Sequence, residues 1–155
     1  MFIFDSIYYI CYNLLPNIKR RSVMNKTTLE VLSWDEPVIE DFSAENAVNI
    51  AKAKYKSAGW MRGTFTSVYL IHYTIYNPQK LHEVRSTFTG YTIFSGIING
   101  KAGSITFLET GEHSENRLIS NLSIKPDGTT NDFIGLEGCG KYTFENGQVI
   151  LLTEF

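Results

Sequence analysis

Residues 64–76 read TFTSVYLIHYTIY, the longest β-prone run in the chain. β-Branched and aromatic side chains fill most of its positions, and these residue types favour strands. One face of the predicted strand carries Phe65, Ser67, Tyr69, Ile71, Tyr73 and Ile75. The opposite face carries Thr66, Val68, Leu70, His72, Thr74 and Tyr76. Because neither face is charged, we expect both faces to be covered.

Similar segments lie on both sides of this run. The predicted strands cover residues 27–34, 49–56, 64–76, 86–94, 103–110, 117–124, 141–144 and 148–152. Asn146-Gly147 is the strongest hairpin signal, because a two-residue turn needs positive φ at both positions. The glycine-rich residues 96–103 predict another hairpin, and Lys125-Pro126-Asp127-Gly128 predicts a turn. Only residues 44–50 have a loosely helical pattern.

Turn signals at intervals of about ten residues are typical of a sandwich or a closed barrel. We therefore predict an all-β fold, an eight-stranded antiparallel closed barrel over residues 24–155. Closing the sheet removes its exposed edges. A barrel of this size has room for packed side chains or for one small ligand.

Composition excludes several classes of protein. The chain has 155 residues, which suits one domain, and a net charge of −2, which argues against nucleic-acid binding. Cys11 and Cys139 are too few and too far apart for a disulfide framework. We expect a cytoplasmic protein whose barrel does not enter a membrane.

Residues 1–23, MFIFDSIYYICYNLLPNIKRRSV, differ from the rest. A signal peptide has its basic residues before the apolar run, whereas Lys19-Arg20-Arg21 follows it here. A membrane span or interfacial anchor would be interrupted by Asp5 and Asn13. We favour a third reading, an N-terminal extension outside the domain. Its apolar residues recur at near-helical spacing, which predicts a helix.

The sequence lacks the common catalytic and metal-binding motifs. His72, His82 and His113 do not have metal-ligand spacing, so neither metal nor cofactor is expected. A phosphate loop is excluded, because Gly96 and Gly100 are one residue too close and Ala102 stands where a hydroxyl is needed.

Glu109 is the candidate catalytic residue. It shares strand parity with Ile105 and Phe107, so an inward face would bury it in an aromatic lumen and raise its pKa. The alternative is a position at the solvent-exposed rim. The candidate ligand-binding residues are Tyr69, Tyr73, Phe88, Phe107 and Glu109. The alternative for the four aromatic residues is that they pack in the hydrophobic core and bind no ligand.

Residues 86–111, STFTGYTIFSGIINGKAGSITFLETG, and residues 128–144, GTTNDFIGLEGCGKYTF, carry a family resemblance. They resemble a bacterial domain family of unknown function with an allene oxide cyclase-like barrel. The matched positions are Phe88, Gly90, Gly96, Gly100, Gly103, Ser104, Gly111, Gly128, Asp132, Gly135, Leu136 and Gly138. This chain has Leu108-Glu109 where the family commonly has Gln-His. The resemblance implies a closed, oligomeric barrel and no established reaction.

Three functions are compatible with these features. The first is binding of a small apolar or amphipathic molecule in the lumen, favoured by its aromatic residues and the lack of catalytic motifs. The second is a cyclase- or isomerase-like reaction, with Glu109 as a polar anchor. The third is a structural role as a homo-oligomer, with the uncharged outer face of residues 66–74 as the subunit interface.

Overall fold

The computed structural model describes residues 24–37, 46–76, 80, 83–115 and 117–155. The predicted helix in residues 1–23 and the position of His82 lie outside these ranges. The strands are β1 (Asn25–Asp35), β2 (Ala47–Gly59), β3 (Met61–Ile75), β4 (Arg85–Ile98), β5 (Lys101–Ser114), β6 (Arg117–Thr129), β7 (Cys139–Glu145) and β8 (Gln148–Glu154). A 3₁₀ helix, η2 (Asn131–Phe133), joins β6 to β7.

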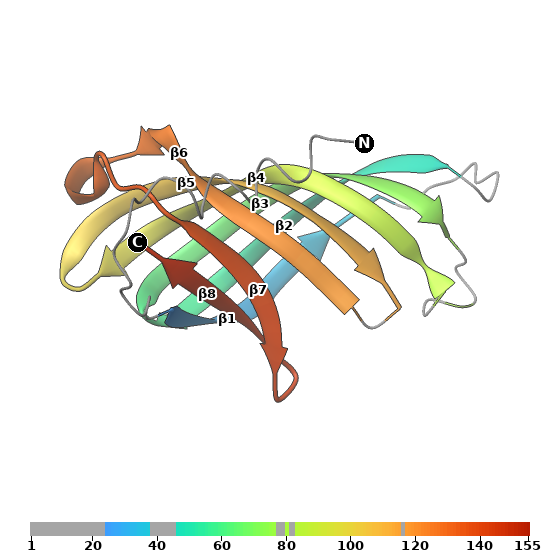
Figure 1. Ribbon diagram of the computed structural model, residues 1–155, viewed down its shortest axis with the longest axis horizontal. Helices are drawn as coiled ribbons and strands as arrows, with labels where there is room; N and C mark the ends of the chain where they lie inside the picture. The colour runs from blue at the N-terminus through green and yellow to red at the C-terminus, as the bar shows by residue number, and fades with distance from the viewer. Residues whose placement is uncertain (1–23, 38–45, 77–79, 81–82, 116) are drawn as a thin grey trace, which may run out of the picture.

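The strands form one closed antiparallel barrel in the order β1 to β8. Each strand pairs with the next, and β1 returns to pair with β8 from Asn25↔Thr153 to Leu29↔Val149. The strands run obliquely around the barrel (Figure 1). The predicted eight-stranded barrel is thus confirmed.

The turn chemistry explains how neighbouring strands connect. Asn146 and Gly147 have φ of 51° and 78°, and Asn99 and Gly100 have φ of 50° and 77°. Both pairs make the two-residue turns that positive φ allows. The hairpin between β4 and β5 is therefore tighter than the glycine-rich run suggests, since both strands extend to this turn.

Two local expectations were wrong. Ala47–Ile50 begins β2 rather than a helix, and residues 44 and 45 lie outside the described ranges. β6 continues through the predicted turn at residues 125–128 as a bulge of its own: Phe107 pairs with Ile124 and Ile105 with Thr129, so these residues lie opposite Thr106 alone. The outer face of β3 is exposed in the single chain, and its covering by a partner stays a prediction.

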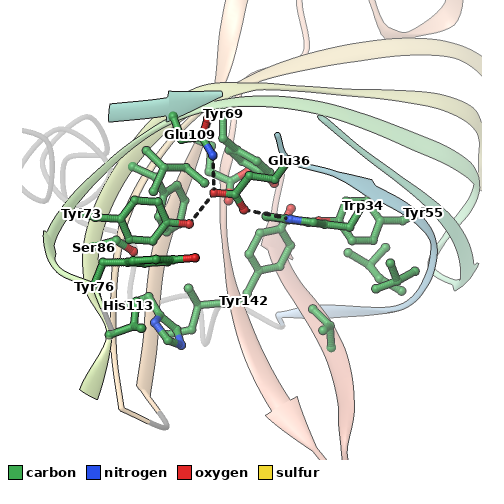
Figure 2. Close-up of a pocket in the computed structure, with 18 of the residues that line it drawn as sticks. Trp34, Glu36, Tyr55, Tyr69, Tyr73, Tyr76, Ser86, Glu109, His113 and Tyr142 are labelled. Carbon is green, nitrogen blue, oxygen red and sulfur yellow. Dashed lines mark hydrogen bonds between the residues drawn. The ribbon is translucent and has the colours of Figure 1, made fainter. Parts of the chain in front are cut away.

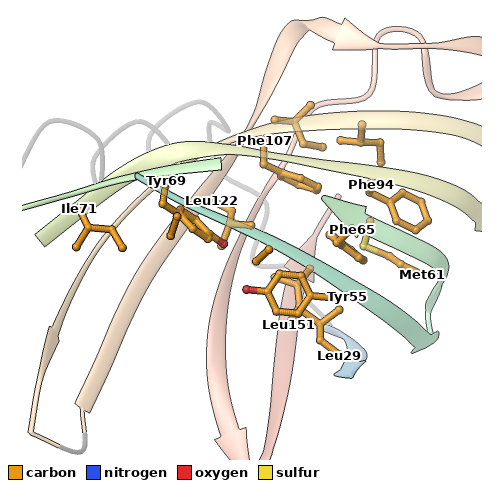
Figure 3. Packing of buried hydrophobic residues seen from close by; sticks show 14 of the residues in the cluster. Leu29, Tyr55, Met61, Phe65, Tyr69, Ile71, Phe94, Phe107, Leu122 and Leu151 are labelled. Carbon is orange, nitrogen blue, oxygen red and sulfur yellow. The ribbon is translucent and has the colours of Figure 1, made fainter. Parts of the chain in front are cut away.

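Large apolar side chains fill one end of the lumen. Met61, Phe65 and Phe94 are fully buried there, and the rings of Phe65 and Phe94 are 5.0 Å apart (Figure 3). Phe133 of η2 packs against Phe94, with ring centroids 6.4 Å apart. Burial of each such ring stabilises the fold by about 1.5–3 kcal/mol.

A row of glycines on β3, β4 and β5 makes room for these rings. Gly63 pairs with Gly96, and Gly96 pairs with Gly103. A Cβ at Gly96 would lie 2.8 Å from the Phe94 ring, and a Cβ at Gly103 would lie 2.8 Å from the Phe133 ring. The glycines of the family pattern therefore let aromatic rings lie close to the sheet.

We expect Gly96→Ala to lower the free energy of unfolding by about 2 kcal/mol, as overpacking does. The added methyl would lie 2.2 Å from the backbone oxygen of Arg62, so the strands must move apart. Urea unfolding measures the effect. Ser95→Ala, at the neighbouring exposed position, should stay within about 0.5 kcal/mol of wild type. Equal effects of the two variants would contradict the packing role of the glycine.

Candidate functional site

A cavity of about 670 Å³ occupies the other part of the lumen. All eight strands contribute to its walls, together with residues 36, 37, 76 and 84 outside the strands. The described lining residues are Leu29, Val31, Trp34, Glu36, Pro37, Asn49, Tyr55, Tyr69, Ile71, Tyr73, Tyr76, Val84, Ser86, Phe88, Glu109, His113, Leu118, Tyr142 and Val149. Figure 2 shows that aromatic rings and two carboxylates face one another across it.

Two β-bulges aim aromatic side chains into the cavity. In β1, Val31 pairs with Tyr55 but Ser33 pairs with Lys54, so Leu32 is an extra residue. In β3, the pairing shifts after Tyr73, and Thr74 is the extra residue there. Because side chains alternate along a strand, one inserted residue reverses the face of those after it.

The consequence is clearest for Trp34 and Tyr76. Parity with Tyr73 predicts that Tyr76 lies on the outer face, yet it lines the cavity. Trp34 also lines the cavity and stacks on Tyr69, with ring centroids 6.1 Å apart. Both rings thus join the inward-facing Tyr69 and Tyr73.

Glu109 lies inside the barrel, with 1 % of its surface exposed. Its Oε2 accepts hydrogen bonds from the hydroxyls of Tyr69 at 3.1 Å and Thr92 at 2.7 Å. Its Oε1 accepts one from Ser120 at 3.0 Å. The Ser67 hydroxyl lies 2.8 Å from that of Thr92 and extends the network. Among the described residues, no cation forms an ion pair with Glu109.

Burial raises the pKa of Glu109 above its ordinary value of 4.5, and the hydroxyl hydrogen bonds partly offset that effect. Burial also raises the pKa of Tyr69, and the charge of Glu109 raises it further. The same two causes, in the same order, raise the pKa of Tyr142. A buried carboxyl group with a raised pKa is able to exchange a proton with a bound molecule.

Glu36 is a second carboxylate at the mouth of the cavity. Its Oε2 accepts a hydrogen bond from Trp34 Nε1 at 3.1 Å, and its Oε1 accepts one from Asn49 Nδ2 at 3.0 Å. Oε1 also accepts a hydrogen bond from the Tyr73 hydroxyl. Burial raises the pKa of Tyr73, and this hydrogen bond raises it further.

The structure brings together four of the five predicted site residues. Tyr69, Tyr73, Phe88 and Glu109 line the cavity. Phe107 does not, because it lies in the filled part of the lumen, where it is fully buried in the apolar core.

Sequence reasoning missed Glu36, Trp34 and Tyr142. Glu36 directly precedes Pro37, and such a pair is typical of a turn rather than of a binding site. The one signal in the sequence for Glu36 is its position two residues after Trp34, which ends the predicted strand over residues 27–34. The signal for Tyr142 is the alternation along the short strand β7. Gly140 is buried and Lys141 is exposed, which places the Tyr142 side chain on the inner face.

Other candidate features have local partners. Asp132 accepts a hydrogen bond from the Ala102 backbone N–H at 2.9 Å, which ties η2 to the β4–β5 hairpin. His72 lies 3.0 Å from the Asn46 side-chain oxygen on the outer surface. Within the described ranges, no group of three His, Cys, Asp or Glu residues is placed to hold a metal ion. Nor does any helix of those ranges have the length and apolar character to cross a membrane.

We expect Glu109→Gln to remove a pH dependence of stability. Between pH 4.5 and the raised pKa, folded Glu109 keeps a proton that the unfolded chain releases. Its contribution to stability is therefore complete below the unfolded pKa and is lost as pH rises through the folded pKa. Glutamine does not titrate. The free energy of unfolding of Glu109→Gln minus that of wild type should thus grow with pH, by up to about 1.4 kcal/mol per pH unit in this window.

Urea unfolding of both proteins at matched pH values measures this difference. The other titratable groups cancel in the subtraction. A difference that stays constant from acid to neutral pH would contradict the raised pKa of Glu109.

Comparison with known proteins supports the fold. Residues 25–154 match a family described as a protein of unknown function, DUF3224. A crystal structure of a DUF3224-family protein with unknown function from Shewanella oneidensis MR-1 is similar, with a TM-score of 0.67 and 18 % sequence identity. The similarity covers 86 % of this chain and 97 % of that one.

Among curated proteins, none matches the chain. At 18 % identity, the Shewanella structure shows a shared fold and carries no information on a ligand. The family match spans nearly the whole described barrel, which confirms the resemblance seen in its glycine pattern. The chain belongs to the DUF3224 family.

Proposed function

We propose that this protein binds a small amphipathic molecule in the lumen of its barrel. The observation that carries the proposal is the cavity of about 670 Å³ beside a filled core. Pockets for small molecules measure about 300–1,000 Å³, with mostly apolar walls and a few polar groups. Here Ile71, Val84 and Phe88 supply apolar wall, while Glu36 and Glu109 are the polar groups.

A cyclase- or isomerase-like reaction is the alternative use of the same cavity. The observation that favours it is Glu109, a buried carboxyl group with a raised pKa on the cavity wall. Catalysis would require a bound molecule whose reacting atom lies within hydrogen-bond distance of this carboxyl group. Mass spectrometry distinguishes the two functions, because a binding protein returns the bound molecule unchanged.

We also propose that two copies associate through the outer sheet face. Six exposed apolar side chains of β2, β3 and β4 form an outer apolar patch, made of Val48, Ile50, Val68, Leu70, Tyr91 and Ile93. Their exposed fractions are 45–62 %. Cross-strand pairing places Ile50 beside Leu70 and Val68 beside Tyr91. Contiguous apolar surface of this kind is typical of an interface.

We expect Ser86→Trp to weaken binding of N-phenyl-1-naphthylamine, a neutral apolar fluorophore, by at least about tenfold. Ser86 is buried on the cavity wall, beside its partner Tyr73 on the neighbouring strand. An indole at this position would therefore project into the cavity. Fluorescence titration measures the affinity. Thr87→Trp adds the same ring at the next, outward-facing position and should change affinity by less than about twofold.

Thermal unfolding of both variants checks that the barrel is intact. Failure of the fluorophore to bind wild type would contradict the proposed function. So would binding that only Thr87→Trp disrupts, because the fluorophore would then lie on the outer surface.

We expect wild type to sediment as a dimer at micromolar concentration and Leu70→Glu to sediment as a monomer. In a two-fold interface each substituted residue occurs twice, so two carboxylates would be buried together. Leu32→Glu is the matched control, because Leu32 is 56 % exposed on β1, outside the outer apolar patch, against 49 % for Leu70. A monomeric wild type, or a dimer that survives Leu70→Glu, would overturn the proposal.

A further inference from the structure

The charge of the cavity narrows the class of ligand, on the condition that the proposed binding function holds. We propose that the ligand is an amphipathic organic cation, a protonated amine on an apolar body. Its ammonium group lies against the Glu109 carboxyl group and beside the Tyr142 hydroxyl, both of which line the cavity. The apolar body extends along Ile71 and Val84.

The first support is the distribution of charge on the described cavity wall. Glu36 and Glu109 line the cavity, and no Lys or Arg does. The lysines of β2, Lys52, Lys54 and Lys56, are exposed on the outer surface. A carboxylate ligand would therefore face the Glu36 and Glu109 carboxyl groups with His113 as the single basic side chain of the described wall, at a site where water screens charges poorly. An ammonium group would instead face groups that can carry the opposite charge, Glu36 and Glu109.

The second support is the incomplete environment of Glu109. An ionised carboxylate can accept about four hydrogen bonds, two at each oxygen. Among the residues that the structure describes, Oε2 of Glu109 accepts two hydrogen bonds and Oε1 accepts one, from Ser120. All three donors are neutral hydroxyls. A buried carboxylate without an opposite charge is unfavourable, so an ammonium group at Oε1 would supply the missing charge and donor.

The third support is the Tyr142 hydroxyl. It is buried and makes no hydrogen bond of standard geometry with a described residue, although the Glu109 carboxyl group and the Tyr69 hydroxyl are close enough to act on it. Tyr142 lines the cavity, and the charge of Glu109 acts on its hydroxyl. Figure 2 shows the Tyr142 ring on the opposite side of the cavity from Tyr73. A phenol oxygen accepts N–H hydrogen bonds, so the same ammonium group can satisfy it.

Aromatic rings complete a site for a cation. Trp34 stacks on Tyr69, and the edge of one ring meets the face of the other in the Tyr69–Phe88 pair, at 5.4 Å. The faces of such rings attract organic cations. Glu36 at the mouth adds a second negative charge, which raises the local concentration of cations.

Three matched probes test the charge of the ligand: octylammonium, octanol and octanoate at neutral pH. They share an apolar chain and differ in the head group. Isothermal titration calorimetry should show octylammonium binding at least about tenfold more tightly than octanol, and octanoate more weakly than octanol. Equal or tighter binding of octanoate would overturn the cation proposal.

Two variants test the position of the ammonium group. Glu109→Gln should weaken octylammonium by at least about tenfold and change octanol by less than about threefold. Tyr142→Phe should weaken octylammonium by about threefold to tenfold and leave the barrel folded, because its hydroxyl makes no hydrogen bond of standard geometry with a described residue. The Tyr142→Phe variant keeps the test decisive if Glu109→Gln does not fold. Octylammonium affinity unchanged in a folded variant would overturn the assigned position.

The failures of the two proposals are distinguishable. Tight binding of octanol and N-phenyl-1-naphthylamine without a preference for octylammonium would overturn the cation proposal and leave the binding function standing. Absence of binding by every probe would overturn both.

Discussion

The closure of the sheet, by pairing of β1 with β8, is the constraint on which the rest of the structure depends. Once the barrel closes, every strand must turn alternate side chains into a lumen of fixed width. Glu109 is buried for this reason: it shares the inward parity of Ile105 and Phe107 on β5. The fold then supplies hydroxyl donors from three other strands, Tyr69 of β3, Thr92 of β4 and Ser120 of β6. A carboxylate fixed in this way is part of the barrel wall and not a mobile rim residue.

The lumen is divided because side-chain size differs along its length. Glycines at one end let the rings of Phe94 and Phe133 lie against the sheet and fill the space between the walls. Towards the other end, smaller inward residues such as Ser86 leave the cavity open. Gly111 likewise makes room for a ring beside the cavity, since a Cβ at that position would lie 2.4 Å from the Phe88 ring. Glycines thus shape both the filled and the open part.

Alternation and turn chemistry were sufficient to predict the barrel. Asn146-Gly147 located its hairpin, and period-two patterns located the strands. The inward position of Glu109 followed from parity alone, although parity could not tell burial from the rim, because strand ends are uncertain by a few residues. The cavity was less predictable. Leu32 and Thr74 are ordinary strand residues, so nothing marked them as bulges, and the parity of Trp34 and Tyr76 was lost with them. The contacts that place Glu36 in the site include residues far along the chain, such as Tyr73, which the local sequence does not reveal.

The same features that make the cavity suited to a ligand lower the stability of the barrel. Glu109 is buried without an opposite charge among the described residues, and the Tyr142 hydroxyl is buried without a hydrogen bond of standard geometry to any of them. Apolar residues of similar size at these positions would satisfy the core equally well, since replacing buried polar groups by well-packed apolar ones is often neutral or stabilising. Sequences usually agree with their fold at every level except at functional sites. Both groups lie on the wall of one cavity, so a molecule that binds them would stabilise the folded chain by the free energy of binding.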